Sequence, residues 1–253
     1  MKKLTLATFF IMLVAGCAVA QGAKPWTEWA KKDAEKMLND SAWGKTQEDT
    51  NASTLMYTPT PNDTTKDNSK ATTADPGFST GPKYDAGATN QAISLKYRIR
   101  FFSAKPVREA FARMIVLTAG KDEATSKAIS AKLQAGFVDL DYGDYVVVAV
   151  GLESTDRRQL APAEAAFHNG TAGTLKTKCY LERNDGKRVY LVEYEPPTPD
   201  QTGAKFIFPR SLEEQPFLTE GDTIRFVAEV GDKVKLNMKY KVSDMMFGGK
   251  LEY

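Results

Sequence analysis

The longest near-unbroken apolar run beyond the N-terminus covers residues 144–152, Asp-Tyr-Val-Val-Val-Ala-Val-Gly-Leu. The run is rich in β-branched residues, is too short for a buried helix and is bounded by turn-forming residues. Such a segment is typical of a strand that is buried on both faces and therefore lies in the middle of a sheet. The run informs the fold and not the function, because its apolar core offers no side chain for chemistry.

Apolar positions recur with helix or strand periodicity through residues 92–253, which predicts one α+β domain there. Helical spacing predicts helices from Pro106 to Gly120, over about 122–135 and over about 162–168. Asn184-Asp185-Gly186 and Gly231-Asp232 are turn signals that each predict a hairpin. Alternating segments predict further strands over about 95–101, 175–181, 189–194, 206–208, 224–230, 234–242 and 245–253. Together these elements predict an α+β fold with an antiparallel β-sheet or sandwich of about eight strands and two or three helices packed on one side.

All three tryptophans lie in residues 24–45, which the apolar spacing predicts to be a Trp-rich N-terminal helix. Trp26 and Trp29 share a face of this helix, and Trp43 folds back after its expected end. The rings either fasten the helix onto the domain or form an aromatic face that binds a partner, a glycan or another ligand. Residues 46–91 are rich in Thr, Asn, Asp, Ser, Pro and Gly and show no periodicity, which predicts a disordered polar linker.

One segment resembles known proteins. From Trp29 to Trp43 the chain reads W-x-K-x-D-A-E-x-x-L-N-D-S-x-W. Residues 26–43, which contain this pattern, resemble a segment near the N-terminus of some exported bacterial proteins of unknown function. The resemblance covers under a tenth of the chain and implies no activity, so it assigns no site residue.

The N-terminus follows the plan of a bacterial secretory signal, with two lysines, a short apolar run and small residues. The apolar run is too short for a transmembrane anchor, which needs roughly 20 residues. Val14-Ala15-Gly16-Cys17 resembles a lipobox, which would remove residues 1–16 and place a lipid on Cys17. Ala18-Val19-Ala20 is instead a site for ordinary signal peptidase, which would remove residues 1–20. Either site predicts an exported protein, located in the periplasm, on the outer membrane as a lipoprotein, or outside the cell.

Charge is balanced once the signal is removed. The full chain has 34 Lys and Arg residues against 32 Asp and Glu, and the signal takes Lys2 and Lys3 with it. A neutral chain argues against a polyanion binder driven by bulk charge, so nucleic acid is not an expected partner. Cys17 and Cys179 are the only cysteines, and neither cleavage product leaves Cys179 a partner for a disulfide. Its place in an alternating segment predicts a small buried residue.

Three aspartates that precede the central strand form the best local cluster of carboxylates. Asp139, Asp141 and Asp144 surround a glycine, an arrangement that can wrap Ca²⁺, so calcium is the one candidate cofactor. They do not form an EF-hand loop, because Val150 stands where the bidentate Glu belongs. The alternative is a polar turn between a helix and the strand, which needs no metal.

No catalytic motif is evident. The single histidine, His168, lies at a predicted helix end, which is typical of a capping or surface residue. His168 and Cys179 alone are too few ligands for a zinc site. The chain contains no H-E-x-x-H or C-x-x-C motif and no Gly-rich phosphate loop after a strand. One G-x-S-x-G match, Gly77–Gly81, falls in the predicted linker and has no strand or helix pattern around it. No catalytic or cofactor-binding residue is therefore assigned.

Two predicted strands carry basic side chains on one face. If adjacent in space, these faces would form a cationic surface for anionic lipid or polysaccharide; otherwise they are the solvent sides of half-buried strands. The basic residues are Lys96, Arg98 and Arg100 on one strand and Lys233, Lys235, Lys239 and Lys241 on the other.

The sequence therefore predicts a non-enzymatic exported protein of the bacterial envelope that binds a partner protein, a glycan or a lipid. Contact with a membrane is expected only through a lipid on Cys17, with no transmembrane helix in the mature chain. Two alternatives stay open. One is a hydrolase-type enzyme built from scattered carboxylates and tyrosines, and the other is a structural subunit of an envelope complex.

Overall fold

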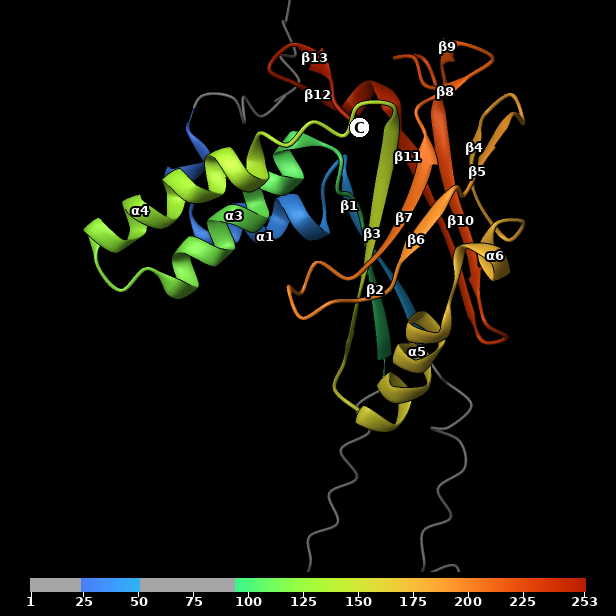
Figure 1. The fold of residues 1–253 in the computed structure, drawn as a ribbon, viewed down its shortest axis with the longest axis horizontal. Coiled ribbons are helices and arrows are strands. Elements are labelled where there is room, and N and C mark those ends of the chain that lie inside the picture. The colour runs from blue at the N-terminus through green and yellow to red at the C-terminus, as the bar shows by residue number, and fades with distance from the viewer. Residues whose placement is uncertain (1–23, 51–93) are drawn as a thin grey trace, which may run out of the picture.

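A computed structural model describes residues 24–50 and 94–253 as two larger β-sheets with helices around them (Figure 1). The predicted signal with Cys17 and the predicted linker from residue 51 onward lie outside the described residues.

The first sheet has five strands and is antiparallel throughout. Its middle strand is β3 (Tyr145–Ser154), in which residues 146–150 are buried, so the prediction of a central strand is confirmed. The sheet order is β1 (Gly44–Thr50), β2 (Ser94–Phe101), β3, β7 (Ala204–Pro209) and β6 (Glu193–Glu195).

The second sheet has four strands and contains both predicted hairpins. Gly186 and Gly231 have positive φ angles of 83° and 60° in the two turns, a conformation that glycine adopts without strain. The sheet order is β11 (Val234–Lys241), β10 (Thr223–Val230), β4 (Cys179–Arg183) and β5 (Arg188–Tyr190). Two short hairpins lie apart from these sheets, β8 (Ser211–Leu212) with β9 (Gln215–Pro216) and β12 (Met246–Phe247) with β13 (Lys250–Leu251).

One hydrophobic core joins the two larger sheets. The ring of Phe206 on β7 lies 5.5 Å from that of Phe226 on β10, edge to face. Phe101 on β2 contacts Tyr240 on β11 with ring centroids 4.9 Å apart, and the Tyr240 hydroxyl donates a hydrogen bond to the carbonyl of Ile99. Such edge-to-face pairs add to the stability gained from burying the rings. These contacts fill the space between the inner faces of the two sheets.

Five α-helices occur in the described residues, more than the two or three predicted, and strands exceed the predicted eight. α1 (Lys31–Asn39), α3 (Lys105–Ala119) and α4 (Glu123–Leu133) lie together on one side, while α5 (Arg157–Asn169) and α6 (Ala172–Leu175) lie elsewhere (Figure 1). None of the helices described is long and apolar enough to cross a membrane. Short helical turns cover Trp26–Glu28, Gln134–Val138 and Val242–Asp244.

The N-terminal segment differs from its prediction. Residues 24–45 do not form one helix, because α1 ends at Asn39 and β1 begins at Gly44. Residues 46–50, expected in the linker, instead continue β1 and pair with β2. A Cβ at Gly44 would overlap the Leu38 carbonyl, so glycine permits the tight return from helix to strand. The polar composition of β1 suits an edge strand, on which Glu48 lies 3.1 Å from Lys96 of β2.

Candidate functional site

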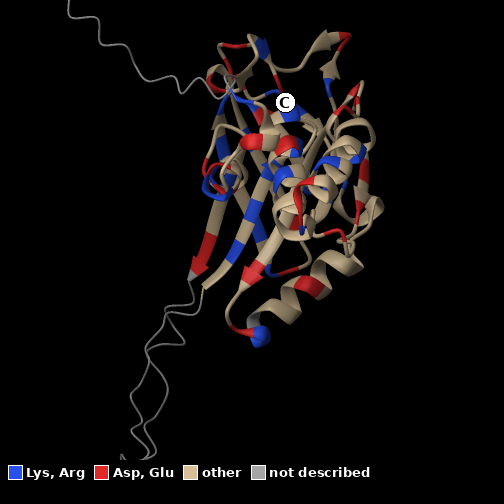
Figure 2. Cartoon of the chain, turned by 90° about the vertical axis from the view of Figure 1, so that its left-hand side faces the viewer, with Lys and Arg blue, Asp and Glu red and all other residues tan. Residues whose placement is uncertain are grey.

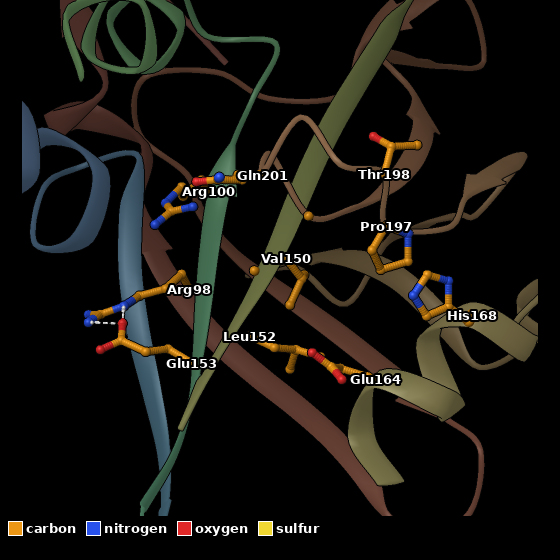
Figure 3. Close-up of a pocket in the computed structure, with 12 residues that line it drawn as sticks. Arg98, Arg100, Val150, Leu152, Glu153, Glu164, His168, Pro197, Thr198 and Gln201 are labelled. Atoms are coloured by element: carbon orange, nitrogen blue, oxygen red, sulfur yellow. Dashed lines mark hydrogen bonds and ion pairs between the residues drawn. The ribbon is translucent and has the colours of Figure 1, made fainter. Parts of the chain in front are cut away.

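A groove of about 380 Å³ runs along β3 where the pairing with β7 ends at Val150. β2 and β3 provide its floor, and α5 and the loop of residues 196–203 provide its walls (Figure 3). Its volume falls within the range of small-ligand pockets, about 300–1,000 Å³. It suits one sugar-sized unit or the end of a longer ligand.

Two glycines give the groove its depth. Gly151 on β3 leaves the floor without a side chain, and a Cβ there would meet Arg100 Nη1 at 3.5 Å. Gly203 has a φ of 94°, and a Cβ there would overlap the Val150 carbonyl, so only glycine lets the loop approach β3 this closely. Asp200 stiffens the same loop by accepting hydrogen bonds from the backbone N–H and the hydroxyl of Thr202, at 3.0 and 2.8 Å.

Arg100 is the most unusual residue of the groove, because it is only 8% exposed and its guanidinium forms no ion pair with any residue that the structure describes. Its Nε donates to the carbonyl of Leu38 and its Nη2 to the side-chain oxygen of Asn39, both at 2.9 Å. Within the described part of the chain, Nη1 donates no hydrogen bond, and it lies beside Gly151 in the groove. Burial, followed by the neighbouring charge of Arg98, lowers the pKa of Arg100 to about 10. A buried cation held only by neutral groups is stabilised by any anion that reaches it.

Arg98 differs from Arg100 because its charge is already neutralised. Its Nη2 and Nε donate to the same carboxylate oxygen of Glu153, at 2.7 and 3.1 Å, and its Nη1 donates to the hydroxyl of Thr46 at 2.7 Å. Two of the three basic residues of the predicted cationic face of β2 are in ion pairs with neighbouring strands, Lys96 with Glu48 and Arg98 with Glu153 (Figure 2). The β2 residues therefore do not form one continuous cationic surface with the lysines of β11.

The opposite side of the groove belongs to α5, from which Glu164 and His168 line it (Figure 3). Asp156 begins this helix by accepting a hydrogen bond from the backbone N–H of Arg158 at 2.8 Å. His168 lies in the last turn and is exposed, as predicted for a residue at a helix end. In Figure 3, Glu164 and His168 lie on the other side of β3 from Arg98 and Arg100, so the groove has a basic end and an end that carries one carboxylate and one imidazole.

The three predicted calcium ligands do not converge. Asp139 accepts hydrogen bonds from Gln134 and Lys105, at 2.8 and 3.0 Å, and these bonds lower its pKa. Asp141 accepts from the backbone N–H of Gly143, and Asp144 is exposed at the start of β3. The described residues contain no group of three or more His, Cys, Asp or Glu side chains that could hold a metal ion. The observed arrangement is that of a polar turn.

A second hollow of about 400 Å³ adjoins this turn. Arg108 lines it, but its guanidinium donates to four backbone carbonyls, those of Phe102, Ser103, Val138 and Leu140. It also lies over the ring of Tyr142, 5.1 Å from the centroid. These contacts join α3 to the turn before β3, and they use Nε, Nη1 and Nη2 of Arg108, whereas Arg100 donates only from Nε and Nη2 within the described residues.

The tryptophans predicted to bind a partner are buried. Trp26, Trp29 and Trp43 are 5%, 7% and 3% exposed, and each indole N–H donates to an acceptor within the chain. Their rings fasten the N-terminal segment to the domain, and the aromatic binding face is not formed. Cys179 is fully buried, as predicted.

Sequence reasoning missed the groove. Arg98 and Arg100 were recognised only as basic positions on a strand, and Gln201 and Gly203 were not singled out. The available signal was a loop rich in proline between two short strands, Pro196-Pro197-Thr198-Pro199.

Comparison with known proteins found no matching family model, no matching curated protein and no matching solved structure. Functional reasoning therefore starts from the geometry alone.

Proposed function

We propose that the protein is a non-enzymatic binding module, exported to the bacterial envelope, that holds an anionic group of its ligand in the groove at Arg100. The observation that carries this proposal is a buried guanidinium that bonds two neutral acceptors and turns Nη1 into a hollow. Charge-assisted hydrogen bonds to a carboxylate or phosphate are about twice as strong as neutral ones, so an anion is the favoured occupant.

Rigidity supports the same proposal. Arg100 is fixed by the end of α1, and the loop opposite is fixed by Gly203 and by the Asp200–Thr202 hydrogen bonds. A site whose polar groups are already oriented loses little conformational entropy when a ligand binds. By contrast, Glu153, Glu164 and His168 are exposed, and Arg98 binds Glu153, so the proposal does not rest on acid–base chemistry.

The experiment uses Gly151 to place an anion inside the protein. Because a Cβ at this position has room and would lie 3.5 Å from Arg100 Nη1, Gly151→Glu brings a carboxylate into the groove. Gly151→Gln fills the same space without the charge and is the matched control. If Arg100 lacks an anion, the free energy of unfolding of Gly151→Glu should exceed that of Gly151→Gln by about 1.5–3 kcal/mol, because a hydrogen bond to a charged group contributes about that much.

Binding is then measured by calorimetry with inorganic phosphate, glucuronate and neutral glucose. The wild type should bind at least one of the two anions more tightly than glucose, and the preferred anion identifies the ligand group. Gly151→Gln should bind this anion more weakly, because its side chain narrows the groove, but should keep the preference over glucose. Gly151→Glu should lose this binding. The proposal is refuted if neither anion binds the wild type, or if Gly151→Glu binds them as well as Gly151→Gln does.

A further inference from the structure

The outer face of the four-stranded sheet carries a second arrangement of polar side chains, away from the groove. Paired residues on neighbouring strands point to the same face, so the register of β5, β4, β10 and β11 defines two rows across the strands. We call the two sets of paired residues the basic row and the tyrosine row. The basic row is Arg188, Glu182, Arg225 and Lys239, and the tyrosine row is Tyr190, Tyr180, Val227 and Asn237.

Glu182 organises the basic row. Its two carboxylate oxygens lie 2.5 Å from Arg188 Nη2 and 2.7 Å from Arg225 Nη2, and its side chain is almost fully buried between them. The two arginine side chains remain 42% and 49% exposed. One carboxylate thus fixes two partly exposed guanidinium groups, and Arg188 donates to it from Nε as well. Lys239 extends the row and pairs across the strands with Arg225, not with an acidic residue.

The tyrosine row lies directly beside these charges. Tyr180 and Tyr190 have ring centroids 5.7 Å apart, and the Arg188 guanidinium lies 4.4 Å from the centre of the Tyr180 ring. Tyr190 is 43% exposed. A hollow of about 580 Å³ covers the adjoining part of the sheet and is lined by Glu182, Arg225, Asn237 and Lys239, among others.

We propose that this face binds an extended anionic polysaccharide, such as a polymer of uronic acids, that lies across the strands. Neighbouring strands are about 4.8 Å apart, so the basic row spans roughly 14 Å, and two residues along a strand place the tyrosine row roughly 7 Å away. Carboxylates of the polymer would bind along the basic row, while the apolar faces of its sugar rings would lie on the tyrosines.

Two observations favour a polysaccharide over other anionic partners. Tyr180 lies under Arg188 and is only partly exposed, which leaves Tyr190 as the one exposed ring of the tyrosine row, less than the apolar face that insertion into a bilayer interface requires. Balanced charge in the chain without its predicted signal, 32 basic against 32 acidic residues, does not suit a nucleic-acid binder.

The test measures binding of polygalacturonate at low salt by calorimetry, with neutral dextran as reference. Lys239→Gln should weaken binding about fivefold, or about 1 kcal/mol, and the effect should shrink as NaCl is raised. Lys235→Gln is the matched control, because Lys235 lies on the same strand and face but pairs with Glu229 outside the basic row. Tyr190→Ala should also weaken binding, and its effect should persist at high salt.

Several outcomes would overturn the proposal. These are no binding of polygalacturonate, equal losses for Lys239→Gln and Lys235→Gln, or tighter binding to anionic phospholipid vesicles or single-stranded DNA than to polygalacturonate. The losses caused by Lys239→Gln and Tyr190→Ala should be the same in the Gly151→Glu background, where the groove no longer binds an anion, which separates this face from the groove. Circular dichroism of each variant confirms that it is folded.

Discussion

Because of Glu109, the free energy of unfolding should fall as the pH rises from about 4.5 to about 7. This glutamate lies on α3 and is only 8% exposed. Burial raises the pKa of its carboxyl group to about 7, and the opposing effects of Lys105 and Arg108 are smaller. The fold therefore favours the neutral acid, because a carboxylate at this position would lose most of its hydration.

The size and sign of the effect follow from proton linkage. The pKa is 4.5 in the unfolded chain and about 7 in the fold, so the folded protein binds the proton more tightly. The free energy of unfolding is then unaffected below about pH 4.5, falls as the pH rises through the interval, and has lost about 3 kcal/mol above pH 7. This loss is a large share of the total for a typical domain, about 5–15 kcal/mol.

Glu109→Gln removes the titration and keeps the shape of the neutral acid. We expect the variant to match the wild type at pH 5 and to exceed its free energy of unfolding by up to about 3 kcal/mol at pH 8. Urea unfolding followed by fluorescence measures the difference, because all three tryptophans are buried and should respond to unfolding. Glu164→Gln, on the exposed surface of α5, is the control and should change the pH profile little. A constant difference between Glu109→Gln and the wild type from pH 5 to pH 8 would refute the reasoning.

Two further predictions concern Gly203 and Cys179. Gly203→Ala should lower the free energy of unfolding by about 1–3 kcal/mol, because the new methyl overlaps the Val150 carbonyl at a φ of 94°. Gly248→Ala is the control, because Gly248 also has a positive φ, 58°, but a methyl group there meets no atom within 4 Å. Urea unfolding should show a smaller loss of free energy of unfolding for Gly248→Ala than for Gly203→Ala. Equal losses would contradict the role of the overlap with Val150. In protein without residues 1–20, Cys179 should resist a thiol reagent while folded and react in urea, because burial raises its pKa to about 12. Rapid labelling of the native protein would show that the thiol is accessible.

Much of the fold was predictable because its strands have strong local patterns. β3 was identified because apolar residues on both faces suit only the middle of a sheet. The hairpins were identified because Gly186 and Gly231 stand where the turns require positive φ. β1 was missed because its seven residues are polar on both faces, which removes any period of two. β1 is held in the sheet by its pairing with β2 and by a hydrogen bond from the Gln47 side chain to the backbone of β11. Both are long-range contacts, which no local sequence pattern encodes.

The groove was less predictable than the fold. Arg100 differs from Arg98 only through the end of α1, whose Leu38 and Asn39 lie about 60 residues away in sequence. The aspartates before β3 were noticed correctly as a cluster, but Lys105 and Gln134, which bind Asp139, lie on helices whose packing the sequence does not reveal. Local composition therefore indicates which residues are charged, and only long-range contacts decide which of them remain available.

The N-terminal segment of residues 24–50 is an integral part of the domain, because it supplies a strand of the first sheet and contacts both α3 and the C-terminal residues. It pairs with β2 over seven residues, receives a hydrogen bond from Arg113 of α3 at Trp29, and donates one from Trp43 to the carbonyl of Glu252. The same segment supplies both acceptors of Arg100. The chain is thus suited to fragment complementation: residues 24–50 and 94–253 hold the complementary parts of one core. A truncation that starts at residue 94 would remove the support of the groove together with a sheet edge, so the two cannot be separated by shortening the protein.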